Sequence, residues 1–284
     1  MFLHMIQLKR CFNLVATINN KGELKMRIPI YQIDAFTDKR FQGNPAAVCP
    51  LAEWITDDLM QNIAAENNLS ETAFFVKKKH KYELRWFTPK VEVDLCGHAT
   101  LASAYVIFSY LDKTSRKVIF HTKSGMLEVS REGNLLSMFF PSREGEKSEI
   151  PEELIKGLGK RPKEAYKSRD YMAVFETEQE IMDLSLNMNE LKKVNGLGVI
   201  ATAKGNEVDF VSRFFAPKEG IDEDPVTGSA HCTLVPYWKR VLGKNEFVAL
   251  QLSPRGGKLF CADLDDMVKI SGKGVSYLEG VINV

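Results

Sequence analysis

Residues 96–111, CGHATLASAYVIFSYL, are the stretch that decides the fold of this 284-residue chain. Alanines and large apolar side chains cover nearly the whole circumference of the helix that this stretch predicts, so the helix belongs in a core. A second apolar helix is predicted to begin at residues 228–230, GSA. A shift of 131 positions (228 minus 97) pairs Gly97 with Gly228, His98 with Ser229 and Ala99 with Ala230. Two helix starts in one shared context predict two similar lobes.

Short strand patterns surround both helices in the sequence. They favour an α+β fold in which each lobe is a mixed β sheet or barrel wrapped around its central helix. We assign residues 28–140, with part of the C-terminal segment, to the first lobe and residues 141–284 to the second. The charged stretch 141–169, which begins at Pro141 and carries Pro151 and Pro162, is the expected crossing between the lobes.

Three segments near the start of the chain each predict a local structure. Residues 1–27 include a short apolar stretch without a cleavage site, and we expect a disordered extension there. Residues 37–45, TDKRFQGNP, predict a loop because Gly43 and Pro45 mark a turn. Residues 56–68, TDDLMQNIAAENN, predict a helix with Thr56 as its N-cap.

Charge and composition exclude several classes of function. The 38 Lys and Arg residues nearly balance 37 Asp and Glu, so a net charge of +1 gives no field that would gather nucleic acid or a membrane surface. No apolar run is long enough to cross a bilayer, and we expect a water-soluble protein. The five cysteines include no CxxC pair, which predicts reduced thiols in a cytoplasmic protein.

The two glycine-led helix starts are the first candidate binding elements. A helix N-terminus presents backbone N–H donors, and glycine lets a ligand approach them closely, so Gly97 and Gly228 could each hold a carboxylate. An equally open interpretation is that these glycines only begin core helices.

Two polar residues stand near these starts. His98 should lie in the first turn of its helix, where the positive end of the helix dipole favours a neutral imidazole, or it is a capping or packing residue. Asp224 precedes Pro225 in the acidic stretch IDEDPVTGS and could orient the groups at the second start. A solvated acidic turn is the alternative.

Glu71 opens the predicted strand ETAFFV, where alternation places it on one face with Phe75. A carboxylate on such a face is expected to be partly buried, which suits general acid–base catalysis. On spacing alone, an ordinary glutamate in water is the commoner case.

The sequence gives little evidence for a metal site or a nucleotide-binding motif. Cys96, His98, His231 and Cys232 lack the spacing of a zinc site, and side chains on one helix should diverge, so we predict no metal. P-loop, GxGxxG, HExxH and GxSxG motifs are absent from the sequence. Proton transfer without a cofactor is the chemistry that remains.

Five blocks in chain order carry a resemblance: YQIDAFTDKRFQGNPAAV, NLSETAFF, RWFTPKVEVDLCGHATLASA, EDPVTGSAHCTLVPYW and QLSPRGG. Over residues 28–284 the chain resembles the PhzF-like isomerase family of phenazine biosynthesis. The resemblance implies a diaminopimelate-epimerase-like fold of two lobes with a cleft between them, usually in a homodimer. It also implies catalysis with neither metal nor organic cofactor.

The resemblance further implies roles for single residues. Glu71 of NLSETAF matches the acid–base carboxylate that takes a proton from one carbon and returns it to another. His98, Asp224 and Ser229 match the polar partners that position the substrate and assist the transfer. Asn44 of GNPAAV is a motif residue of the family, and we count it with the two glycines as substrate-binding.

More distant relatives, the amino-acid epimerases and racemases, place a cysteine before the glycine at both helix starts. Here Cys96 occupies one such position and Thr227 the other, so the two-thiol mechanism is excluded. We expect an isomerase that shifts a proton within a small carboxylated metabolite through Glu71. An epimerase or racemase, or a non-catalytic small-molecule-binding or protein-interaction module of the same fold, are the alternatives.

Overall fold

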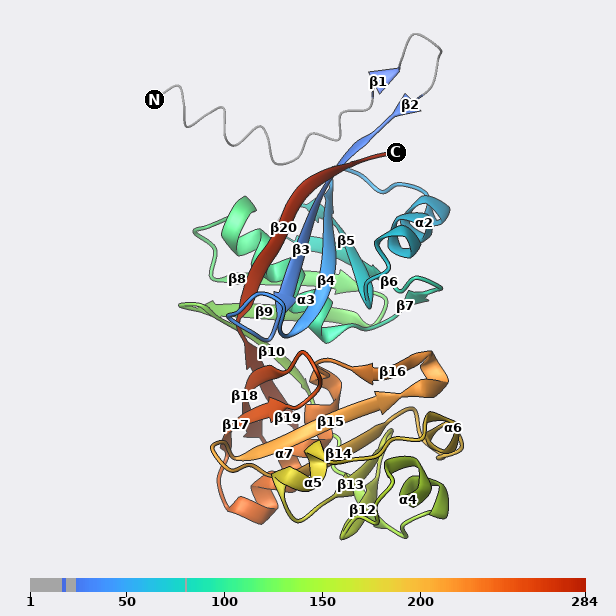
Figure 1. The fold of residues 1–284 in the computed structure, drawn as a ribbon. Coiled ribbons are helices and arrows are strands. Elements are labelled where there is room, and N and C mark those ends of the chain that lie inside the picture. Colours follow the sequence, from blue (N-terminus) through green and yellow to red (C-terminus); the bar gives the residue numbers. More distant parts are fainter. Residues whose placement is uncertain (1–16, 19–23, 80) are drawn as a thin grey trace. The chain divides into compact units, whose positions relative to one another are not determined.

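The computed structural model describes residues 17–18, 24–79 and 81–284 (Figure 1). The disordered extension predicted for residues 1–27 therefore lies mostly outside the described residues. Within it, β1 (Thr17–Ile18) and β2 (Leu24–Lys25) pair antiparallel. Met26 and Val284 exchange two backbone hydrogen bonds of 2.6 and 2.9 Å.

The chain folds into two compact units. Unit 1 comprises Met1–Phe41, Pro45–Met138 and Lys273–Val284, and unit 2 comprises Gln42–Asn44 and Phe139–Gly272. Among the described residues, no helix has the length and apolar character that crossing a membrane requires.

Unit 1 is built from strands and two helices, with a π-helical turn extending the second helix. Its strands are β3 (Arg27–Ala35), β4 (Asn44–Leu51), β5 (Glu71–Lys78), β6 (Lys81–Phe87), β7 (Glu92–Val93), β8 (Lys117–Thr122), β9 (Gly125–Glu132), β10 (Leu135–Pro141) and β20 (Gly274–Asn283). Its helical segments are α2 (Asp57–Asn67), α3 (Gly97–Val106) and η1 (Ile107–Leu111). Strand β10 carries the chain into unit 2.

Unit 2 is likewise built from strands and helical segments. Its strands are β11 (Glu146–Ser148), β12 (Glu164–Lys167), β13 (Tyr171–Val174), β14 (Val199–Lys204), β15 (Phe210–Ala216), β16 (Ile221–Asp224), β17 (Glu246–Gln251), β18 (Gly257–Leu264) and β19 (Met267–Gly272). Its helical segments are α4 (Glu152–Leu158), α5 (Glu178–Met182), α6 (Met188–Leu191), η2 (Pro217–Glu219) and α7 (Gly228–Leu242).

The two units repeat one arrangement of strands. In unit 1, β4 is parallel to β5, β5 antiparallel to β6, β6 parallel to β8, and β8 antiparallel to β9. In unit 2, β13 is parallel to β14, β14 antiparallel to β15, β15 parallel to β17, and β17 antiparallel to β18. Helix α3 comes between β7 and β8, as α7 comes between β16 and β17. The predicted α+β fold of two similar lobes, each with a central helix in a mixed sheet, is confirmed.

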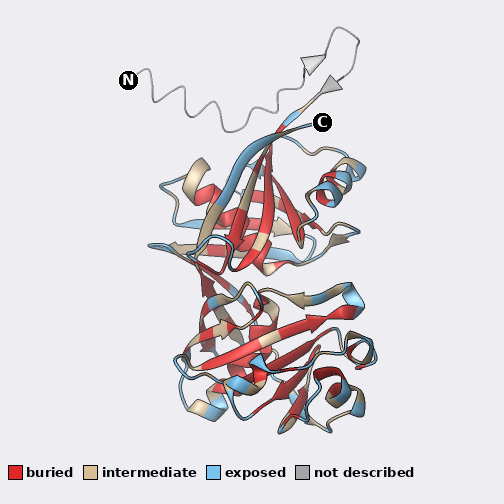
Figure 2. Ribbon diagram, in the orientation of Figure 1, coloured by how far each residue is buried: buried red, intermediate tan, exposed pale blue. Residues whose placement is uncertain are grey.

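Helices α3 and α7 begin at the predicted glycines and are buried along most of their length (Figure 2). Leu101 and Leu234, one from each helix, are completely buried. Such burial is what an all-round apolar helix requires, because no face of it is suited to water. A site at the first turn of either helix therefore rests on a core element.

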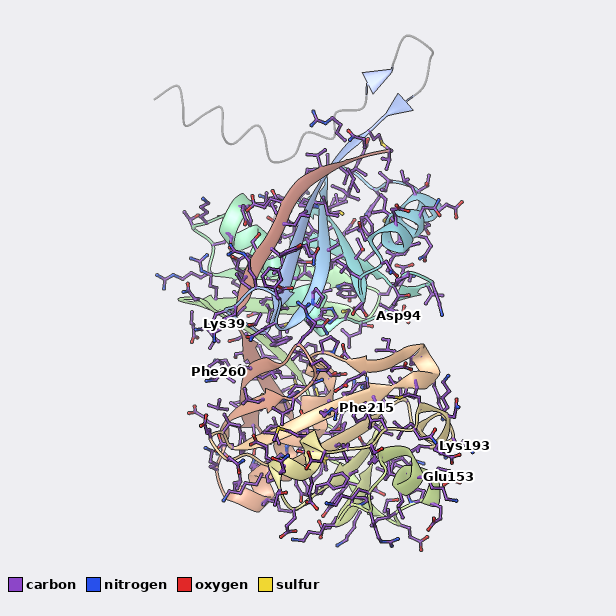
Figure 3. All side chains as sticks on the ribbon, viewed as in Figure 1. Lys39, Asp94, Glu153, Lys193, Phe215 and Phe260 are labelled. Carbon is purple, nitrogen blue, oxygen red and sulfur yellow. The ribbon has the colours of Figure 1, made fainter. Side chains whose placement is uncertain are left out.

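Two sequence-based predictions differ from the structure. Residues 141–169, expected to cross between lobes, fold into β11, α4 and β12 of unit 2, because Leu154 and Leu158 join a core that includes Phe215 (Figure 3). The predicted loop at residues 37–45 ends early, since β4 already begins at Asn44. Most of β4 is buried, so its sequence lacks the alternation that reveals a strand with one face in water.

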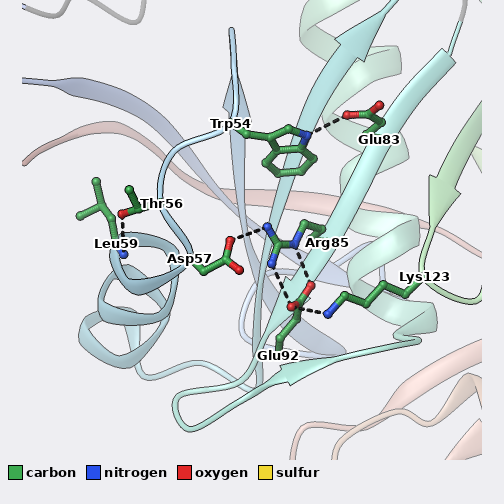
Figure 4. Close-up of polar contacts among 8 residues, drawn as sticks. All are labelled: Trp54, Thr56, Asp57, Leu59, Glu83, Arg85, Glu92 and Lys123. Atoms are coloured by element: carbon green, nitrogen blue, oxygen red, sulfur yellow. Dashed lines mark hydrogen bonds and ion pairs between the residues drawn. The ribbon is translucent and has the colours of Figure 1, made fainter.

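A cluster of charges holds β7, the strand that leads to α3, against its neighbours (Figure 4). Arg85 donates two hydrogen bonds to the carboxylate of Glu92, of 2.7 and 2.9 Å, and one of 2.8 Å to Asp57. The hydrogen bond from Arg85 keeps the pKa of Glu92 below its ordinary value. Thr56 caps α2 as predicted, by accepting a hydrogen bond from the Leu59 N–H. The cluster fixes the strand four residues before Cys96.

Candidate active site

Glu71 is placed by a tight connection between α2 and β5. Helix α2 ends at Asn67, and the φ of its C-cap Asn68, 49°, lies in the left-handed region that asparagine tolerates better than most residues. The Asn67 amide donates to the Thr72 hydroxyl over 3.1 Å and steadies the start of β5. Glu71 then stands opposite Ala46 of the parallel strand β4 and is only 9% exposed. The expected partial burial of Glu71 is confirmed.

His98 in the first turn of α3 faces Glu71. Its Nε2 lies 3.1 Å from Oε2 of Glu71, and the residue is only 6% exposed. The two side chains come from different elements, a strand start and a helix start, and both elements are anchored in the core of unit 1. A buried carboxylate beside an imidazole can exchange a proton with a bound substrate and keep its charge compensated.

The expectation that His98 is held neutral by the helix dipole is wrong. Burial alone would lower the pKa of His98, but its interactions with Cys96 and Glu71 raise that pKa well above its ordinary value. Burial also raises the pKa of the Cys96 thiol. A carboxylate at 3.1 Å outweighs the dipole of one helix, whose effect is on the order of 1 kcal/mol.

Cys96 completes this group. It is the N-cap of α3 and has extended backbone angles, φ −143° and ψ 110°. Its Sγ lies 3.6 Å from Nδ1 of His98. For Cys96 and His98, the expectation that these side chains diverge around a helix is therefore wrong, because Cys96 precedes the helix and does not follow its periodicity.

Asp224 ends β16 in unit 2 and lies at the centre of a polar cluster. Its carboxylate accepts a hydrogen bond of 2.7 Å from the Asn44 amide and another from the Thr227 hydroxyl. The buried Gln251 amide donates to the Asp224 carbonyl over 2.7 Å and accepts from the Thr227 N–H over 2.8 Å. These contacts fix the DPVT turn that leads into α7, as an orienting role for Asp224 requires.

Ser229 lies in the first turn of α7. Its hydroxyl oxygen accepts a hydrogen bond of 3.0 Å from Arg169 Nη2. Arg169 is in turn paired at 2.8 Å with Asp170, which is 1% exposed. The hydroxyl of Thr227, the N-cap, does not cap α7 because it donates to Asp224 instead. The first turn of α7 thus combines backbone donors, a serine hydroxyl and a guanidinium.

The predicted site residues divide between the two units. Glu71, Gly97 and His98 belong to unit 1, and Asn44, Asp224, Gly228 and Ser229 belong to unit 2. The structure adds three residues that the sequence did not single out: Arg169, Asp170 and Gln251. Gln251 is the first residue of QLSPRGG, a block that carried the family resemblance but whose residues were given no role. Arg169 and Asp170 carry no recognisable local pattern.

Comparison with known proteins decides the family. The PhzC-PhzF family, described as phenazine biosynthesis-like protein, matches residues 33–280 of the chain. The chain belongs to this family. The predicted membership is therefore confirmed.

Relatives within the PhzC-PhzF family are similar over nearly their full length. An uncharacterized isomerase of Pseudomonas aeruginosa is 49% identical over 91% of this chain and 100% of its own. A solved structure of the PhzF family from Enterococcus faecalis is 45% identical, with a TM-score of 0.89 over 90% of this chain and 99% of that one. The first protein shares sequence with the chain, and the second shares both sequence and fold.

A more distant likeness concerns the fold alone. A hydroxyproline epimerase from Agrobacterium vitis, solved with bound trans-4-hydroxy-L-proline, has a TM-score of 0.58 at 9% identity, covering 91% of this chain and 92% of its own. The PhzC-PhzF chain thus has the diaminopimelate-epimerase-like fold that the sequence blocks implied.

Proposed function

We propose that this PhzC-PhzF family member is an isomerase that shifts a proton within a small carboxylated metabolite, with Glu71 as the acid–base group. The observation that carries the proposal is the contact of 3.1 Å between the buried Glu71 carboxylate and the His98 imidazole. The isomerase names of the bacterial relatives give further support.

In this proposal Glu71 removes a proton from one carbon of the substrate, exchanges it with water while the carboxyl group holds it, and delivers a proton to another carbon. The carboxylate becomes neutral while it holds the proton, and His98 compensates its charge before and after the transfer. The transfer needs no organic cofactor, because both half-steps use the same carboxyl group. Backbone N–H groups at the Gly97 start are suited to the negative charge that develops on the substrate.

The polar groups at the start of α7 in unit 2 are suited to hold a carboxylate. Ser229 accepts from Arg169, so its own proton remains available to a carboxylate. Asp224 holds Asn44 and Thr227 and so shapes the turn before Gly228. The homodimer implied by the resemblance stays a prediction, which the molar mass in solution tests.

One observation favours a second candidate function. The Cys96 thiol lies 3.6 Å from His98 Nδ1, which would let Cys96 exchange a proton through His98 in an epimerase. Thr227 stands where a second thiol would be needed, so such an epimerase would have to pair Cys96 with Glu71. This candidate makes Cys96 essential, whereas proton shift by Glu71 does not.

Deuterium uptake tests the proposal. The protein is incubated with a metabolite extract in heavy water, and carbon-bound deuterium is measured by mass spectrometry. Wild type and the surface control Glu66→Gln on α2 should label one carboxylated metabolite, and Glu71→Gln should not. Equal labelling by Glu71→Gln would exclude Glu71 as the base. Loss of labelling in Cys96→Ser as well would favour the epimerase.

A further inference from the structure

Three donor groups of different chemistry meet at the start of α3. Glu71, Cys96 and His98 offer a carboxylate oxygen, a thiol sulfur and an imidazole nitrogen, and these ligand atoms all lie within 4.8 Å of one another. They come from the first residue of β5, the N-cap of α3 and its first turn. Cys96 and His98 are buried, and Glu71 is nearly so.

The spacing of two of these atoms fits a tetrahedral ion. Zinc binds thiolate sulfur at about 2.3 Å and imidazole nitrogen at about 2.0 Å, which places two such ligands about 3.6 Å apart at the tetrahedral angle. Cys96 Sγ and His98 Nδ1 are 3.6 Å apart. Glu71 Oε2 lies 3.1 Å from Nε2, the other ring nitrogen of His98, so the Glu71 side chain would have to turn toward the Nδ1 side to join them, a movement that rotation of a glutamate side chain can supply.

The charges of the three groups also suit a divalent cation. A thiolate and a carboxylate supply two negative charges, and a neutral imidazole adds none, so a bound dication leaves the buried group without net charge. A mixed sulfur, nitrogen and oxygen donor set favours soft or borderline ions over Mg²⁺ and Ca²⁺, which prefer oxygen ligands alone. Three protein ligands leave a fourth position for water.

We propose that Glu71, Cys96 and His98 bind one thiophilic divalent cation, Zn²⁺ or Cd²⁺, as an inhibitory site. Binding occupies the carboxylate of Glu71, and proton transfer stops until the ion is removed. The inhibition rests on the proposed function, whereas the binding itself does not. The ion is an inhibitor of the enzyme and not its cofactor.

Cobalt gives a direct test of binding, because thiolate ligation to Co²⁺ produces a charge-transfer band in the near ultraviolet and tetrahedral geometry intensifies the visible bands. The reduced, metal-free full chain is titrated with Co²⁺, and Zn²⁺ is then added as competitor. One equivalent of Co²⁺ should bind with both signatures, and Zn²⁺ should remove them.

Variants assign the ligands. Cys96→Ser should abolish the charge-transfer band, while Glu71→Gln and His98→Asn should retain thiolate ligation with affinity weakened about 10-fold or more. Cys232→Ser on α7 and Cys11→Ser, which lies outside the described residues, should leave the titration unchanged. Circular dichroism verifies that each variant is folded. No charge-transfer band in wild type, or an unchanged titration in folded Cys96→Ser, would overturn the site.

Inhibition is measured separately, by adding Zn²⁺ to the deuterium-uptake reaction and then removing it with a chelator. Labelling should stop in the presence of Zn²⁺ and recover after chelation. Labelling that continues with Zn²⁺ bound would overturn the inhibitory role without affecting the binding result. Absence of labelling in metal-free wild type would count against the proposed function and leave the cobalt titration valid.

Discussion

Arg169 Nη2 donates a hydrogen bond of 3.0 Å to Ser229 Oγ, across 60 residues of sequence. An arginine nitrogen can only donate, so this contact turns the serine hydroxyl proton away from Arg169. The same guanidinium is paired with Asp170, which is 1% exposed. Arg169 therefore orients Ser229 and compensates a buried carboxylate at once.

Replacing Arg169 should destabilise the fold. We predict that Arg169→Met lowers the free energy of unfolding by about 2–4 kcal/mol, because the Asp170 carboxylate stays buried without its cation. Chemical denaturation measures this loss. The double variant Arg169→Met with Asp170→Asn should regain at least about 1 kcal/mol, since the uncompensated charge is gone. A double variant no more stable than Arg169→Met would contradict this account.

His98 should be essential to proton transfer. We predict that His98→Asn slows deuterium uptake by roughly 100-fold or more, because an amide cannot compensate the charge of Glu71 as an imidazolium does. His121→Asn on β8 of the same unit is the matched control and should label at the wild-type rate. If both variants label equally fast, His98 has no part in the reaction.

The length of the Glu71 side chain should matter as well as its charge. Glu71→Asp keeps the carboxylate but withdraws it by one methylene, a displacement of about 1 Å that commonly costs about 100-fold in rate. We predict slow but measurable labelling for Glu71→Asp and none for Glu71→Gln. Full activity of Glu71→Asp would show that the carboxylate does not act at a fixed distance.

His231 should make the stability depend on pH. It is fully buried in α7, and its Nδ1 lies 2.9 Å from the Thr227 carbonyl, which can only accept, so Nδ1 carries the proton. Burial lowers the pKa of His231 from 6.5 to about 4. Because its folded-state pKa is depressed, the unfolded chain binds the proton first. The contribution of neutral His231 to the free energy of unfolding is complete above pH 6.5 and is lost as the pH falls toward 4.

Over this pH range the free energy of unfolding should fall by about 3 kcal/mol because of His231 alone. Denaturant unfolding at a series of pH values measures it. His231→Gln should flatten the dependence between pH 6.5 and pH 4, whereas Glu66→Gln should retain it. A wild-type slope that persists in His231→Gln belongs to other groups.

The Arg85 cluster should contribute more to stability than an exposed ion pair. We predict that Arg85→Met costs about 2 kcal/mol, because Glu92 loses two hydrogen bonds in a largely buried place. Lys273→Met, which removes an exposed ion pair with Asp38, should cost less than about 0.5 kcal/mol. Thermal unfolding compares the two. Equal losses would mean that burial of the Arg85 cluster gives no advantage.

Several features of this protein could be predicted from its sequence. The starts of α3 and α7, the Thr56 cap and the partial burial of Glu71 follow from apolar periodicity, helix capping and strand alternation, all of which act over a few residues. The order of five motif blocks identified the family. Such signals are local, or they are inherited with the sequence, so they need no knowledge of packing.

Only the tertiary structure decided which polar groups meet. Glu71 contacts His98, and Arg169 contacts Ser229, because sheets and helices that are distant in sequence pack against a common core within each unit. The charge of His98 could not be predicted for the same reason: the helix dipole is visible in the sequence, but the nearby carboxylate is not. The sequence determined where helices begin, and packing determined what stands beside them.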